Sequence, residues 1–120
     1  MAGITPIKKV LTELSRLPKV IGVFVISKEG FVIESITSRE AFDEEALAAM
    51  STAAIGSIEA LGKELDLGKT EMITLEYSGS LILASDLGEN LVMLVAEKGA
   101  VLGRLRYELK KNIPRITAAL

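Results

Sequence analysis

The chain contains no cysteine, no histidine and no tryptophan, and these absences exclude several kinds of chemistry. Without cysteine it cannot form a disulfide or a thiolate metal site, and it is compatible with a reducing compartment. Without histidine or cysteine it lacks the commonest general base and the strongest side-chain nucleophile. Serine and threonine occur, but none lies in a nucleophile elbow such as G-x-S-x-G. We therefore expect a protein that is not an enzyme and that carries no cofactor and no metal.

Charge of one sign and aromatic side chains are also scarce. The 14 basic and 16 acidic residues give a net charge of −2, and only two tyrosines and three phenylalanines are present. Nucleic-acid-binding proteins usually have a basic surplus or aromatic platforms on which bases stack. We therefore expect no nucleic-acid partner.

No long hydrophobic run is present. The longest apolar stretch, Val20–Ile26, is far shorter than the roughly 20 residues that span a bilayer. The N-terminus lacks the pattern of a signal peptide. We expect no membrane insertion and a cytoplasmic location.

Apolar residues are nevertheless abundant for a chain of 120 residues, which we expect to form one domain over residues 1–120. They make up 49% of the sequence, and the mean hydropathy is +0.40. Small domains expose a large share of their surface. The surplus must therefore be covered by helices on both faces of a sheet or by a partner.

The first half of the sequence predicts a helix, a hairpin and a second helix. Thr5 and Pro6 suit a helix start, apolar residues recur at helical spacing to Leu17, and Pro18 ends the helix. The hairpin consists of Val20–Ile26, a turn that Gly30 closes, and Phe31–Ser35. Asp43 caps a helix of about 22 residues that ends at Leu65.

The second half predicts three strands and a final helix. The strands are Thr70–Tyr77, Ser80–Ser85 and Leu91–Ala96, with turns at Gly79 and Gly88. A helix follows Gly99, and Pro114 should kink or interrupt it. Short connections predict an α+β fold with a central five-stranded antiparallel sheet and helices on both faces. The two strands that are apolar throughout should be central.

Two patterns imitate functional motifs. Gly68-Lys69-Thr70 ends like a phosphate-binding loop, but the required glycine five residues earlier is Lys63, and the stretch runs from a helix into a strand. A plain helix-to-strand turn is the better interpretation. The acidic cluster Glu40, Asp43, Glu44 and Glu45 could suggest a metal site, but capping of a helix explains it.

The second helix has two distinct faces. One is a stripe of mostly large apolar residues, which we expect to lie on the sheet: Leu47, Met50, Ala54, Ile58, Leu61 and Leu65. The other is a seam of small residues that would let a second helix come close: Ala46, Ala49, Ala53, Gly56 and Ala60. Alanine could also simply fill a solvent-facing side.

The strand Thr70–Tyr77 has a partly polar face that includes Thr70, Met72 and Thr74. If it lies at the edge of the sheet, its free backbone groups could pair with another chain. Pairing across a two-fold axis would extend the sheet and bring two small-residue seams together. Together with the apolar surplus, this predicts a homodimer.

The order of elements resembles the roadblock, or dynein light-chain, domain family. So do the motifs GVFVISKEGFVI at 22–33, LAAMSTAA at 47–54 and GAVLGRLRYEL at 99–109. The resemblance extends from Ile7 to about Ile116; it departs at the hairpin turn, where members often carry Asp before the glycine, and at Pro114.

This resemblance implies a sheet with one helix on one face and two on the other, related to the profilin-like and longin arrangements. It also implies dimers that join at a sheet edge and pack their central helices. The implied function is a non-catalytic scaffold or regulator of a Ras-like small GTPase, with Arg39 as a candidate arginine supplied in trans. A solvated loop charge is the favoured interpretation of Arg39. The alternative function is a structural dimerisation module or light chain in a motor or signalling assembly.

Overall fold

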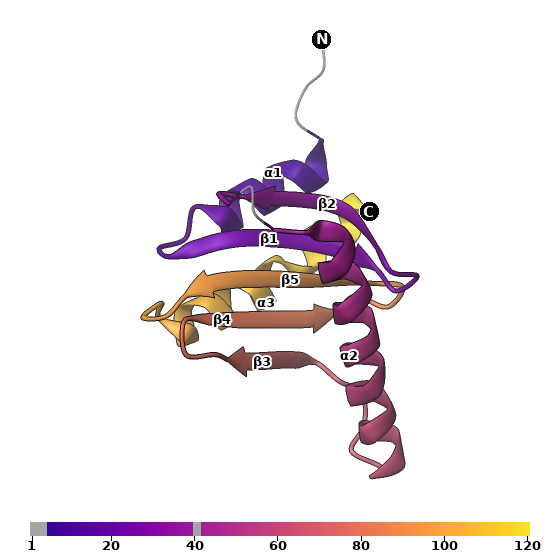
Figure 1. The fold of residues 1–120 in the computed structure, drawn as a ribbon. Helices are drawn as coiled ribbons and strands as arrows, with labels where there is room; N and C mark the ends of the chain where they lie inside the picture. The colour runs from indigo at the N-terminus through magenta and orange to yellow at the C-terminus, as the bar shows by residue number, and fades with distance from the viewer. Residues whose placement is uncertain (1–4, 40–41) are drawn as a thin grey trace.

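A five-stranded antiparallel sheet lies between two helical layers in the computed structural model, which describes residues 5–39 and 42–120 (Figure 1). The eight elements follow the order that the sequence predicts. They are α1 (Pro6–Ser15), β1 (Val20–Ser27), β2 (Phe31–Thr37), α2 (Glu44–Glu64), β3 (Met72–Glu76), β4 (Ser80–Asp86), β5 (Asn90–Glu97) and α3 (Leu102–Ala119).

The strands are arranged in the order β2-β1-β5-β4-β3, and every neighbouring pair is antiparallel. The two strands that are apolar throughout, β1 and β5, are interior, as expected. β2 and β3 form the two edges of the sheet. In the sequence, α2 connects β2 to β3. Because these two strands form opposite edges, the helix must cross the sheet.

Two hydrophobic cores lie on opposite faces of the sheet. Alternate side chains of β1 point to opposite sides, so that Val23 and Val25 join α1 and α3, whereas Phe24 and Ile26 join α2. Phe24 is fully buried and meets Phe42 edge to face, with ring centroids 5.8 Å apart. This two-sided burial explains why β1 has no polar position before its last residue.

Local signals account for the starts and turns of the elements. Thr5 accepts a hydrogen bond from the backbone N–H of Lys8 at 3.3 Å and caps α1. Gly30 and Gly88 have φ values of +99° and +98°, which side-chain-bearing residues rarely adopt. Gly79 lies at the predicted turn between β3 and β4, without a left-handed φ.

Two details differ from the expectation. Thr70 and Glu71 precede β3 instead of belonging to it, so the edge strand is shorter than the alternating pattern suggested. α3 continues through Pro114 without interruption. The side-chain amide of the neighbouring Asn112 bonds to the carbonyl of Glu108 at 2.8 Å, close to where the missing N–H of proline weakens the helix.

Candidate interaction surface

α2 is longer than the sheet that it crosses. Its 21 residues span about 31 Å at 1.5 Å per residue, whereas five strands spaced ~4.8 Å apart are only ~19 Å across. The helix packs on β1 and β2 with its first turns and projects beyond β3 with its last ones (Figure 1). The part of the helix beyond Glu59 therefore lacks support from its own sheet.

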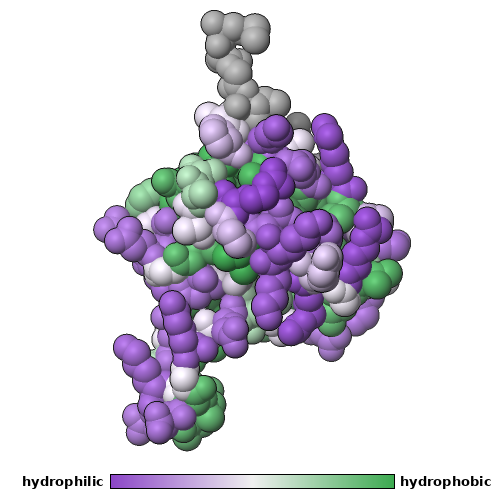
Figure 2. All heavy atoms as spheres, turned by 180° about the vertical axis from the view of Figure 1, so that it is seen from behind, coloured by the Kyte–Doolittle hydropathy of each residue, from purple (hydrophilic) through white to green (hydrophobic). Residues whose placement is uncertain are grey.

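The projecting end exposes three leucines among charged side chains. Leu61, Leu65 and Leu67 are 56%, 57% and 70% exposed. Figure 2 shows the overhang from behind, with hydrophobic side chains at its tip. Exposed clusters of large apolar side chains indicate contact with another surface.

An apolar groove of about 440 Å³ lies beside the same helix. One wall is α2, with Leu47, Met50 and Ile58, and the floor is the sheet, with Ile73 and Leu75 of β3 and Ile82 of β4. Met50 is 67% exposed and Leu75 is 38% exposed. The groove thus lies between α2 and the free edge of the sheet, and has the shape and chemistry to accept a hydrophobic ridge such as a second helix.

The expectation that the apolar stripe of α2 lies on the sheet is wrong. The residues of α2 that are buried against the sheet are Ala48 and Ile55, and Thr52 lies along the same line. The stripe is rotated by about 105° from this line, at 100° per residue, and faces the groove instead. The sheet takes Ala48, Thr52 and Ile55, whereas most of the stripe stays open and only Leu47 packs partly against the core.

The small-residue seam points away from the groove. Ala46 contributes to the groove lining, whereas Ala49, Ala53, Gly56 and Ala60 are exposed outside it. The structure brings Met72 and Thr74 together on the edge strand β3 and leaves Thr70 in the loop before it. A role of the seam in dimer contact stays a prediction.

An ion-pair cluster connects α2 to the sheet. The ammonium of Lys28, in the β1–β2 turn, lies 2.9 Å from a carboxylate oxygen of Asp86 and 3.3 Å from one of Glu59 on α2. Asp86 also accepts a hydrogen bond from the backbone N–H of Gly88 at 2.7 Å. Burial acts to raise the pKa of Asp86, but the Gly88 N–H and the Lys28 ammonium outweigh it and hold that pKa below its usual value.

Comparisons with known proteins agree with this architecture. The family model described as the Roadblock/LC7 domain matches residues 6–97. The chain belongs to the Roadblock/LC7 domain family. An uncharacterized protein of Methanocaldococcus jannaschii is 32% identical over 112 residues, which cover 93% of this chain and 94% of that protein.

Solved structures extend the likeness of this roadblock chain to nearly its whole length. Myxococcus xanthus MglB superposes with a TM-score of 0.90 at 19% identity, covering 98% of this chain and 96% of that one. The gliding protein MglB of Thermus thermophilus gives a TM-score of 0.88 at 19% identity, covering 99% and 93%. At this identity the likeness shows the shared fold, including α3, which lies beyond the part that the family model matches.

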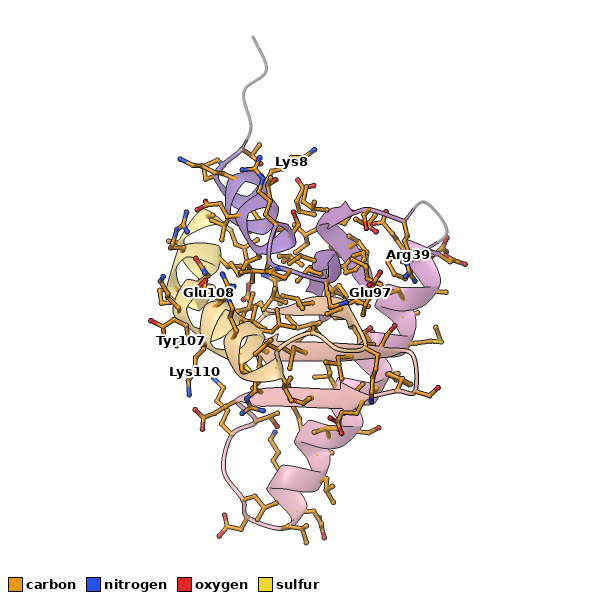
Figure 3. The ribbon with its side chains drawn as sticks, turned by 90° about the vertical axis from the view of Figure 1, so that its left-hand side faces the viewer. Lys8, Arg39, Glu97, Tyr107, Glu108 and Lys110 are labelled. Atoms are coloured by element: carbon orange, nitrogen blue, oxygen red, sulfur yellow. The ribbon has the colours of Figure 1, made fainter. Side chains whose placement is uncertain are left out.

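The remaining predicted features of this roadblock domain occupy separate places. Arg39 is half exposed and lies 3.6 Å from a carboxylate oxygen of Glu97, on a loop at the surface (Figure 3). Gly68, with a φ of +88°, and Lys69 connect α2 to β3, as a helix-to-strand turn. Asp43 caps α2 by accepting from the N–H of Ala46 at 3.1 Å, whereas Glu40 lies outside the described residues.

The described part of the chain shows neither a carboxylate cluster suited to a metal nor a spanning helix. Within residues 5–39 and 42–120, no group of three or more acidic side chains is arranged to hold a metal ion. No helix in these ranges is both long and apolar enough to cross a bilayer.

Proposed function

We propose that this roadblock domain forms a homodimer through its β3 edge and the open side of α2. Three observations support this, and all lie on one side of the molecule. β3 hydrogen-bonds to β4 on one side and is an edge of the sheet on the other. The groove beside α2 is apolar, and the overhang beyond β3 exposes three leucines. Two-fold pairing of β3 strands satisfies free backbone groups and covers both apolar features at once.

In such a pair, the overhang of each copy contacts the groove of the other. When two β3 strands pair in antiparallel fashion, the sheet continues into the second copy. The C-terminal turns of α2 then lie over the sheet of the partner and enter the partner's groove, and the reverse contact is equivalent. The single observation that carries the proposal is that the overhang and the groove flank the same free edge.

The dimer in turn forms a broad platform for a second kind of protein. We propose that it serves as a non-catalytic scaffold or regulator of a Ras-like small GTPase, the function that the roadblock resemblance implies. The doubled sheet carries two α2 helices side by side, with their seams of small residues, which are exposed in the single chain. A flat surface of small side chains lets a partner backbone approach closely.

Regulation by such a platform requires only a difference in affinity. A surface that binds one nucleotide state of a GTPase ten times more tightly than the other shifts their equilibrium by about 1.4 kcal/mol. The shift is reciprocal, so that the nucleotide also controls binding to the platform. Arg39 is held near Glu97 by a single pair with both side chains about half exposed, and could be released to a partner at little cost.

The test uses a Ras-like GTPase from the same organism. We expect the purified protein to co-elute with the GTPase in one nucleotide state and to change its rate of GTP hydrolysis or GDP release. Leu61→Asp combined with Leu65→Asp should abolish the effect if the platform is the dimer. Unchanged rates without co-elution would contradict the proposal. Co-elution with a filament or motor protein, with no effect on any GTPase, would instead support the light-chain alternative.

A further inference from the structure

The helical layer behind the sheet is strongly basic, although the whole chain is not. Residues 5–20 and α3 carry nine of the 14 basic side chains but only two of the 16 acidic ones, a net charge of +7 in a chain whose total is −2. Figure 2 shows this rear face, where hydrophilic side chains gather. The basic residues are all exposed: Lys8, Lys9, Arg16, Lys19, Arg104, Arg106, Lys110, Lys111 and Arg115. A field of this sign attracts anions toward the rear face.

A cleft of about 670 Å³ opens where this face meets the edge of the sheet. It lies between α3 and the segment that leads into β3, on the side of the sheet opposite to the apolar groove. Three basic side chains line it, together with one aromatic ring and two acidic residues: Lys69, Arg106, Lys110, Tyr107, Glu71 and Asp86.

In the part of the chain that the structure describes, the three basic groups of the cleft are unpaired. Within residues 5–39 and 42–120, no carboxylate oxygen lies within 4.0 Å of the charged nitrogens of Lys69, Arg106 or Lys110. The guanidinium of Arg106 is instead oriented by donating to the hydroxyl of Thr74 on β3, at 3.1 Å. That contact uses one of its five N–H donors, so the others remain available for a ligand.

The two acidic residues of the cleft differ in their state. Asp86 is neutralised by Lys28 at 2.9 Å, and its side chain is only 6% exposed. Glu71 has no such partner in the described chain and is exposed. Glu71 therefore opposes an anion in the cleft, whereas Asp86 does so much less.

Size and side-chain chemistry together indicate the class of ligand. A group of lysines and an arginine without acidic partners is suited to phosphate oxygens. A bare phosphate would leave most of 670 Å³ empty, whereas small-molecule sites commonly range from about 300 to 1,000 Å³. Tyr107 is 64% exposed and projects with Lys110 from the outer side of α3, so that its ring can stack on a planar group (Figure 3).

We propose that this cleft binds a phosphorylated small molecule of nucleotide size. Lys69, Arg106 and Lys110 hold its phosphates, and Tyr107 contacts its ring system. The site differs from a phosphate-binding loop, which cradles phosphates with backbone N–H groups at the start of a helix. Here side chains from α3 and from the loop before β3 supply the contacts. The proposal does not depend on the dimer or on a GTPase partner.

In the experiment, the full chain is titrated with GDP, AMP, inorganic pyrophosphate and unphosphorylated guanosine. Calorimetry measures the affinity, and amide chemical shifts locate the binding site. We expect binding of the nucleotides, weaker binding of pyrophosphate, no binding of guanosine, and shifts confined to the loop before β3 and to α3. Lys69→Gln combined with Lys110→Gln should weaken binding about tenfold or more, which corresponds to ~1.4 kcal/mol. Glu71→Gln should tighten it about two- to threefold.

A matched control separates the cleft from the general basic field. Lys8→Gln combined with Lys9→Gln removes the same charge from α1 on the same face and should change affinity less than about twofold. An equal loss in both double variants would overturn the site, as would the absence of shifts at millimolar GDP. Vesicles with an anionic phospholipid test the other source of phosphate. If the protein sediments with these vesicles and does not bind soluble nucleotides, the proposal of a small-molecule ligand is overturned.

Discussion

At the scale of single residues, Lys28 connects α2 to the sheet through Glu59 and Asp86. Asp86 ends β4, Lys28 lies in the β1–β2 turn, and Glu59 reaches them from α2, so that one ammonium connects three elements. Burial acts to lower the pKa of Lys28, but its bonds to Asp86 and Glu59 outweigh it, and the pKa is raised above 10.5. A side chain that gains so many partners stabilises one position of the helix over others.

The first prediction concerns the pH dependence of this cluster. The pKa of Asp86 in the fold is below its usual 3.8, so its ionised form stabilises the fold above that pH, and the contribution is lost as the pH falls through the lowered value. Asp86→Asn can still accept from the Gly88 N–H and thus removes mainly the charge. We expect a loss of about 1 kcal/mol near neutral pH, because Lys28 is partly exposed.

Urea unfolding at fixed protein concentration, from about pH 7 down to pH 3, checks this expectation. The difference between wild type and Asp86→Asn should be constant near neutrality and shrink below about pH 4. A difference that persists unchanged in acid would mean that the charge of Asp86 is not what stabilises the fold.

At the scale of elements, the sequence pattern of α2 predicts some features of the helix correctly and others not. Its start, its length and its two faces follow from Asp43 and from the helical spacing of its residues, and the structure confirms the cap and the length to within one residue. The pattern did not reveal which face meets the sheet. Helical periodicity reports what a face is made of, but it does not report what that face touches.

The physical reason lies in the neighbours of the helix. A close approach to the sheet favours small side chains such as Ala48 and Thr52 on the buried line. The larger stripe, with Met50 and Leu61, is left for the groove and the overhang. Similarly, the cleft at Lys69 and Arg106 could not be predicted, because it joins residues 37 positions apart that only the fold brings together.

The strands were easier to predict than the site. β1 and β5 are apolar at nearly every position, which requires helices on both faces and therefore an interior place in the sheet. The edge position of β3 was only a condition of the sequence argument; the structure places β3 at an edge, and Thr70 lies before the strand.

The element-scale prediction concerns the overhang. Leu61→Asp combined with Leu65→Asp places charges where the proposed partner's groove is apolar and should convert the dimer into a monomer. The fold should survive, because both side chains are more than half exposed in the single chain. Val101→Asp is the matched control, because Val101 is 70% exposed at the start of α3 on the opposite face.

Analytical ultracentrifugation measures the oligomeric state, and circular dichroism measures the helix content. We expect the double variant to sediment as one chain with unchanged helix content, and the Val101→Asp protein to behave like wild type. A double variant that remains dimeric would show that the overhang does not contribute to the interface.

At the scale of the whole molecule, the two faces have different characters. The side with α2 is apolar at its groove and overhang and suits contact with a second copy. The side with α1 and α3 is basic and open at the cleft, and suits an anionic ligand. Dimerisation through β3 would leave both basic faces on one side of the doubled sheet. The cleft also reaches the paired edge, because Met72 of β3 and the loop before it belong to its lining.

The central claim is that the apolar face at β3 and α2 is covered by a second copy. Light scattering coupled to gel filtration, at concentrations on the order of 1 to 100 μM, tests it most directly. The account predicts a mass of twice the 12.8 kDa of one chain throughout this range. A mass of 12.8 kDa at the highest concentration would contradict it.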